Sequence, residues 1–125
     1  MPATVATLNP NGGRPAVEII IGNAQFASFD VSLFDATGLN PQKFGEGDND
    51  DSIPDIFQIP GSPLTVLDQT TVLWRAVVSS FTGTAGETFS VTARVIQDGA
   101  VVASHNKTGL VTDIPPRGAF RLQMG

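Results

Sequence analysis

An acidic segment holds the residue types in this chain that could do the most definite chemistry. Between Glu46 and Asp55 lie five of the chain's 12 Asp and Glu residues. Hard cations such as Ca²⁺ are bound by several carboxylate, amide and carbonyl oxygens, which closely spaced Asp and Asn residues in a tight loop can supply. The alternative is a solvated acidic loop, since blocks of like charge usually stay in water. The sequence predicts a Ca²⁺ site, the only cofactor that it suggests, with ligands drawn from Asp48, Asn49, Asp50, Asp51 and Asp55.

The same segment resembles a known calcium-binding repeat. From residue 47 to residue 55 it reads GDNDDSIPD, which is similar to the aspartate repeats (D-x-D-x-D-G-x-P-D) of thrombospondin type 3 and related bacterial surface proteins. The resemblance implies that Asn49 and Asp51 are ligands, that Ile53 offers its carbonyl oxygen and that Asp55 matches the later Asp. Three residues depart from the repeat and imply a weak site: Gly47, Ser52 and Gln58.

The residues suited to catalysis are few. His105 is the only histidine, and a lone histidine that acts as a base needs a nearby nucleophile and an orienting carboxylate. We expect it at the surface, opposite Thr92, and the alternative is a titrating functional group. Asp30, Asp35 and Glu87 could form a carboxylate pair of the kind that glycosidases use. Each also suits an ordinary place, on a polar strand face, in an Asx-type turn or at a strand start. The sequence therefore predicts no catalytic residues.

Composition narrows the class of protein. The chain has 125 residues, no Cys, 13 Gly and 9 Pro, which favours one all-β domain without disulfides. Outside the acidic segment, seven acids balance seven bases, and no Lys/Arg cluster supplies the footprint of a nucleic-acid-binding surface. No apolar run is long enough for a membrane span, and the N-terminus lacks a Sec signal. We expect a soluble protein made in the cytoplasm and then incorporated into a particle, and its final location stays open.

One β-hairpin can be predicted with its register. Phe89, Val91, Ala93 and Val95 alternate with polar residues, and Asp-Gly at 98–99 favours a two-residue type I′ turn. This turn would pair four residues of the first strand with four of the second: Val95 with Val102 and Ala93 with Ser104 on the core side, and Arg94 with Ala103 and Thr92 with His105 on the outer side.

Further strands are expected at residues 16–21, covered on both sides, and at 26–34 and 71–79, with Trp74 facing the core. Residues 39–63 are expected to be a long loop, and we expect a binding site to lie there. Shorter strands are expected at four places: 56–59, 64–66, and the edge strands 110–111 and 119–122.

Seven or eight strands joined by turns predict an antiparallel two-sheet β-sandwich of the immunoglobulin-like or jelly-roll type. The pattern over residues 17–111 resembles immunoglobulin-like domains in a generic way, without their paired cysteines. Residues 1–125 would form one domain with an extended N-terminal leader (1–15) and a C-terminal tail (116–125). Because both terminal segments are polar, we expect them to contact neighbouring chains.

Three functions follow from these observations. The first is a non-enzymatic structural or interaction protein, a homo-oligomer or a subunit of a larger assembly such as a virion or shell decoration protein. The second is a Ca²⁺-dependent carbohydrate-binding module, and the third is a small carboxylate-dependent hydrolase. Fold alone does not decide among them.

Overall fold

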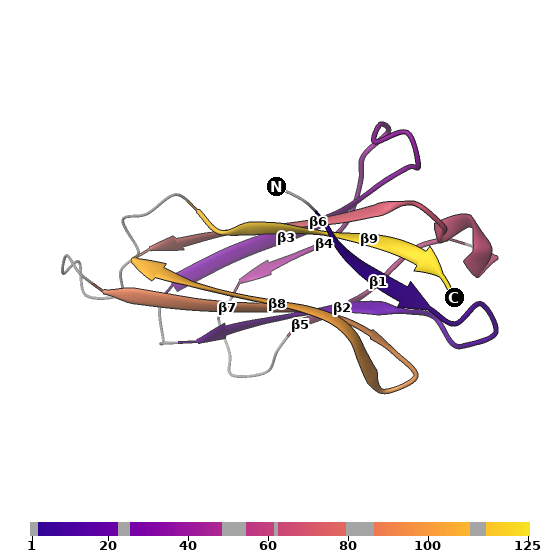
Figure 1. Ribbon diagram of the computed structural model, residues 1–125. Coiled ribbons are helices and arrows are strands. Elements are labelled where there is room, and N and C mark those ends of the chain that lie inside the picture. The colour runs from indigo at the N-terminus through magenta and orange to yellow at the C-terminus, as the bar shows by residue number, and fades with distance from the viewer. Residues whose placement is uncertain (1–2, 23–25, 49–54, 62, 80–86, 111–114) are drawn as a thin grey trace.

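The computed structural model describes residues 3–22, 26–48, 55–61, 63–79, 87–110 and 115–125. Over these residues the chain is an all-β sandwich of two sheets, as predicted (Figure 1). No helix in the described ranges is long and apolar enough to cross a membrane. The described strands are β1 (Thr4–Leu8), β2 (Ala16–Gly22), β3 (Phe26–Phe34), β4 (Gln42–Asp48), β5 (Asp55–Gln58), β6 (Thr71–Ser79), β7 (Thr88–Gln97), β8 (Ala100–Leu110) and β9 (Arg117–Met124).

The two sheets form the two layers visible in Figure 1. One sheet has the strand order β1-β9-β6-β3-β4, and the other has the order β5-β2-β7-β8. The pair β1 and β9 is parallel, and the other described pairs are antiparallel. β2 lies between β5 and β7, whereas the first two strands are neighbours in a constant-type immunoglobulin sandwich.

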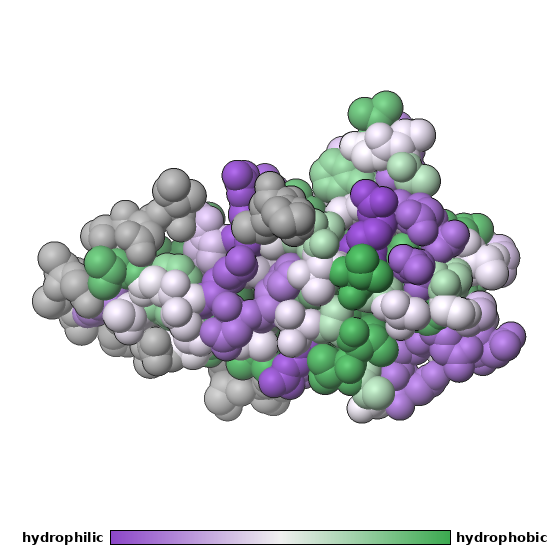
Figure 2. Space-filling model, viewed as in Figure 1, coloured by the Kyte–Doolittle hydropathy of each residue, from purple (hydrophilic) through white to green (hydrophobic). Residues whose placement is uncertain are grey.

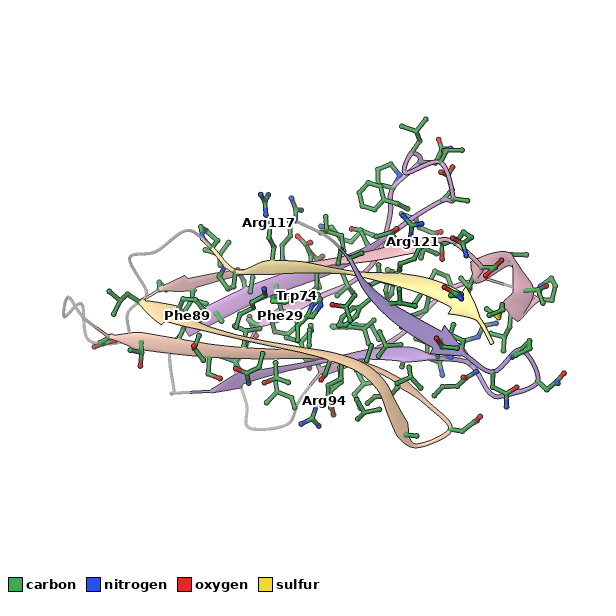
Figure 3. All side chains as sticks on the ribbon, viewed as in Figure 1. Phe29, Trp74, Phe89, Arg94, Arg117 and Arg121 are labelled. Carbon is green, nitrogen blue, oxygen red and sulfur yellow. The ribbon has the colours of Figure 1, made fainter. Side chains whose placement is uncertain are left out.

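The core consists of alternate residues of both sheets, because successive side chains of a strand point to opposite faces. Trp74 is fully buried at the centre, and Figure 3 shows it between the layers with Phe29. The predicted alternation of β7 is confirmed. β2 alternates too, since Val17 and Ile19 are buried while Glu18 between them is partly exposed. The prediction that this strand is covered on both sides was wrong.

The β7–β8 hairpin has the predicted turn but not the predicted register. Asp98 and Gly99 have φ angles of 53° and 76°, as a type I′ turn requires. A β-bulge then shifts the register between Val95 and Ile96, so that Ala93 lies opposite His105. The bulge adds one residue to β8 and reverses the facing of every later residue, which turns His105 from the expected outer side to the core side. The other shifted pairs are Val95 with Ala103, Arg94 with Ser104 and Thr92 with Asn106.

Two local predictions were wrong in the middle of the chain. The expected loop at 39–63 contains the edge strand β4, whose sequence QKFGEGD has little strand propensity. Residues 64–66 belong to a 3₁₀ helix, η1 (Leu64–Leu67), rather than to a strand. The expected short strand at 56–59 is confirmed as β5, one residue earlier in the chain.

Both terminal segments contain strands of the sandwich. β9 lies between β1 and β6, so the expectation of an edge strand at 119–122 was wrong. Ala6 and Leu8 of β1, and Phe120 and Leu122 of β9, are buried in the core. This packing within one chain removes the reason for assigning both segments to contacts between chains. Residue 111 of the other expected edge strand lies outside the described residues.

Candidate binding surface on the five-stranded sheet

Four charged residues form a row across the outer face of the five-stranded sheet, and we call it the charged row. Glu46 of β4 lies opposite Asp30 of β3, Asp30 lies opposite Arg75 of β6, and Arg75 lies opposite Arg117 of β9. Their neighbours along each strand are directed to the core, so alternation points all four side chains outward. Figure 3 shows Arg117 on this outer face, on the opposite side of its sheet from Trp74.

The signs along the charged row are acid, acid, base, base. Residues directly opposite on neighbouring strands attract when their charges differ and repel when their charges are alike. This order gives one attractive pair, Asp30 with Arg75, and two repulsive pairs, Glu46 with Asp30 and Arg75 with Arg117. Alternating signs would make all three pairs attractive. Folding by itself therefore gives no reason for this order of charges.

The central pair of the row is an ion pair with two hydrogen bonds. Arg75 donates from Nε to Asp30 Oδ1 at 3.2 Å and from Nη2 to Asp30 Oδ2 at 3.0 Å. Hydrogen bonding and the negative charge of Asp30 raise the pKa of Arg75 above its usual value. This fork-like geometry holds the arginine in place over the sheet.

The two ends of the row are less engaged. Glu46 accepts a hydrogen bond from Lys43 Nζ at 3.3 Å, and both side chains are exposed, so water weakens this pair. The side chain of Arg117 is exposed and has no hydrogen-bond or ion-pair partner within the part of the chain that the structure describes. The row thus ends in an acid at β4 and an uncompensated base at β9.

The charged row lines a hollow of about 720 Å³. All four residues of the row contribute to its lining, together with Asp48, Ser28 and Val77. The β3–β4 hairpin projects beyond this face of the sheet (Figure 1). A partner that met this face would find a concave surface with one acidic and one basic end.

The structure places two of the five residues predicted to bind Ca²⁺. Asp48 ends β4 and lines the hollow, and Asp55 begins β5. A Cβ atom at Gly47 would lie 2.6 Å from Asp55 Oδ2, on the core side of β4. Asn49, Asp50 and Asp51 lie outside the described residues, so the Ca²⁺ site stays a prediction. The described ranges contain no group of three or more His, Asp or Glu side chains that could hold a metal ion.

His105 lies in a seam between the two sheets. Trp74 Nε1 donates to His105 Nδ1 at 3.1 Å, and His105 Nε2 lies 2.6 Å from Thr4 Oγ1. Since the indole nitrogen can only donate, Nδ1 is the acceptor and the proton of the neutral ring is on Nε2. The ring stacks on Phe120, with centroids 4.2 Å apart. Burial and the nearby Lys107 lower the pKa of His105. The ring lies on the core side of β8, opposite Ala93 and partly buried, so the expectation of a surface residue opposite Thr92 was wrong.

The candidate catalytic carboxylates lie in separate settings. Asp30 is bound to Arg75 in the charged row. Asp35 accepts hydrogen bonds from the side chains of Thr37 and Asn40, which lower its pKa from 3.8 to about 2. This is the Asx-type turn expected from sequence, and its carboxyl group is too acidic to donate a proton at neutral pH. Glu87 directly precedes β7, as expected.

No protein-family model matches the chain, and no curated protein or solved structure is significantly similar to it.

Proposed function

We propose that the chain is a non-enzymatic structural protein that associates with copies of itself through an outer sheet face. The observation that carries this proposal is the charged row. Its order of signs costs stability in a single chain, and this cost is offset when a second charged surface with the opposite order covers the row. A particle or shell is the setting in which we expect such association.

The edges of the two sheets are less suited to association than the faces. Edge strands pair with other chains when they are long, flat and regular. β1 and β5 have 5 and 4 residues, and the register of both β4 and β8 with their neighbours is broken by a bulge. Lys107 of β8 lies opposite the buried Val91 and so points inward, a known way to block pairing at an edge. Strand addition is therefore disfavoured at the described edges.

Light scattering and native mass spectrometry of the full chain test the proposal. We expect a discrete oligomer whose population rises with protein concentration and falls as salt is added, because salt screens exposed charges. A monomer at every concentration up to hundreds of micromolar would contradict it.

A Ca²⁺-dependent carbohydrate-binding module is the second candidate. The observation that favours it is the place of Asp48, since a cation held by the acidic segment would lie at the rim of the hollow. Thermal unfolding with Ca²⁺ and with a chelator tests it, because an ion that binds only the folded state raises the melting temperature. Equal melting temperatures would exclude this candidate.

A further inference from the structure

The order of signs along the charged row is complementary to the same order reversed. When acid, acid, base, base lies over base, base, acid, acid, each charge meets an opposite charge. A two-fold axis between two facing sheets, parallel to the strands, reverses the order of strands in the second copy. Arg117 of the second copy then lies over Glu46 of the first, and the second Arg75 lies over the first Asp30. By the symmetry, the same contacts form with the two copies exchanged. The row spans roughly 14 Å, from strand spacings of about 4.8 Å.

From this match we infer that two copies of the chain bind face to face through the charged row, in a symmetric dimer in which Glu46 of each copy pairs with Arg117 of the other. The inference rests on the proposed function and identifies the charged row as the surface through which the copies associate. Arg117 is the uncompensated base of the row, and Glu46 has only the exposed contact with Lys43. The hollow lies beside Glu46 and Asp48 and has room for the arginine side chain of the second copy.

Two exposed apolar residues fit the same arrangement. The two-fold axis moves the β3–β4 hairpin of one copy over the β9 and β1 side of the other. This hairpin projects beyond the outer face in Figure 1, and Leu39 within it is 63% exposed. Val5 of β1 is 50% exposed and lies opposite the outward Arg121. Association would bring Leu39 of one copy toward Val5 of the other and remove both from water.

The outer face of the four-stranded sheet provides a contrast. Its central row runs from Ile56 through Glu18 and Arg94 to Ser104. It has one ion pair, with Arg94 Nη1 3.4 Å from Glu18 Oε1, and no surplus charge at either end. Figure 3 shows Arg94 directed away from the sandwich on this side. This row satisfies its own charges, so we expect no association through it.

Charge reversal at either end of the charged row tests the inference without harming the fold. Arg117→Glu places an acid opposite Arg75, and Glu46→Arg places a base opposite Asp30, so both changes replace a repulsive pair within the chain by an attractive one. Arg117→Glu should fold at least as stably as the unaltered chain, and Glu46→Arg about as stably, because it also loses the weak exposed contact with Lys43. In the dimer, however, each variant places like charges over each other and should weaken association about tenfold or more.

A mixture of the two variants gives the decisive result. Arg117→Glu and Glu46→Arg should form a mixed dimer, because both interchain contacts then join opposite charges, and native mass spectrometry distinguishes the two chains by mass. The double variant should also associate with itself. Arg94→Glu on the other sheet face is the control for a change of the same charge, and it should leave association unchanged.

Three outcomes would overturn the inference. If the unaltered chain is monomeric, the proposed function fails together with this surface. If it associates and neither reversal weakens association, the function stands and the surface is wrong. If both reversals weaken association and their mixture does not restore it, the face is used without the two-fold pairing of Glu46 with Arg117, for example against a different partner.

Discussion

The two sides of the sandwich, where an edge strand of one sheet approaches an edge strand of the other, are closed by different chemistry. At one side, β1 approaches β8, and a chain of polar contacts runs from Thr4 through His105 to Trp74. At the other side, β4 approaches β5, and the ring of Phe57 lies against the backbone of Gly45. We call the first contact, from Thr4 through His105 to Trp74, the polar seam, and the contact of Phe57 with Gly45 the apolar seam. The polar seam depends on which ring nitrogen of His105 carries the proton, whereas the apolar seam depends only on shape.

Exposed apolar residues lie beside both seams, and Ile56 of β5, beside the apolar seam, is 58% exposed. Figure 2 shows hydrophobic patches over β1 and β8, where Val5 and Val101 are 50% and 52% exposed. Polar groups that bond across such a seam fix the distance and register of the two sheets, because hydrogen bonds are directional and apolar contacts are not. In the apolar seam, glycine fixes the distance between the two sheets, because its missing side chain leaves room for an aromatic ring.

The largest effect is expected from breaking the apolar seam with Gly45→Val. A Cβ atom at this position would lie 2.4 Å from the Phe57 ring and 2.9 Å from Val31, so the ring must leave the seam. Overpacking of this kind should lower the free energy of unfolding by about 3 kcal/mol, measured by urea denaturation. Glu46→Ala, which changes the outward neighbour, is the control and should cost about 0.5 kcal/mol or less. Equal effects of the two changes would contradict the close approach of Phe57.

The next effect concerns the polar seam and uses Gly118→Ala. A Cβ atom at Gly118 would lie 2.6 Å from His105 Nδ1 and 2.7 Å from Trp74 Nε1, and so would separate the two bonded nitrogens. We expect a loss of about 2 kcal/mol from overpacking and from the broken hydrogen bond. In a chain that already carries His105→Ala, the same change should cost less, since one of the two obstructing side chains is gone and Trp74 can shift into the freed space. Additive losses would mean that Gly118 acts elsewhere.

A smaller effect, the dependence of the unfolding free energy on pH, should distinguish the polar seam from the apolar seam. Burial lowers the pKa of His105 below 6.5, with Lys107 adding to the shift, and the contacts with Trp74, Thr4 and Phe120 bring no further charge. A lowered folded-state pKa means that the unfolded chain binds the proton more tightly. The stability from this group is therefore complete above pH 6.5 and is lost as the pH falls from there through the lowered pKa.

The unfolding free energy of the unaltered chain should thus decline more steeply below pH 6.5 than that of His105→Gln, which cannot titrate there. The difference between the two curves removes the contribution of the acidic residues common to both. Gly45→Val should retain the full decline, because the contact of Phe57 with Gly45 has no proton to gain. Parallel curves for the chain with and without His105 would contradict this interpretation.

The two seams also show what the sequence could predict. The strands β6 and β7, which are rich in alternating apolar residues, were predicted with their inward faces, because alternation and burial have the same period. The type I′ turn at Asp98 and Gly99 followed from local chemistry alone. Neither seam was predicted, since each joins residues that are close only after the sheets have packed.

The features that could not be predicted from the sequence have specific structural causes. One bulge residue in β8 was enough to reverse the facing of His105, and a bulge leaves no clear signal in a run of Val and Ala. β4 was missed because its two glycines disfavour a strand. Gly45 is needed there by the ring of Phe57, and Gly47 by the side chains of Asp55 and Phe29. Without β4 and the pairings of β3, β6 and β9, the four residues of the charged row are scattered charges in the sequence.

The smallest effect is expected from Thr4→Val, which removes one partner from the end of the polar seam and keeps the shape and strand propensity of the side chain. Thr4 is exposed, so water replaces part of the lost bond, and the free energy of unfolding should fall by about 0.5–1 kcal/mol. The Trp74 bond to His105 Nδ1 should persist. Nitrogen NMR of the ring should then still report the proton on Nε2 at neutral pH, as in the unaltered chain. A change of tautomer in Thr4→Val would contradict this interpretation. It would show that Thr4 of β1, and not Trp74, determines which nitrogen of His105 carries the proton.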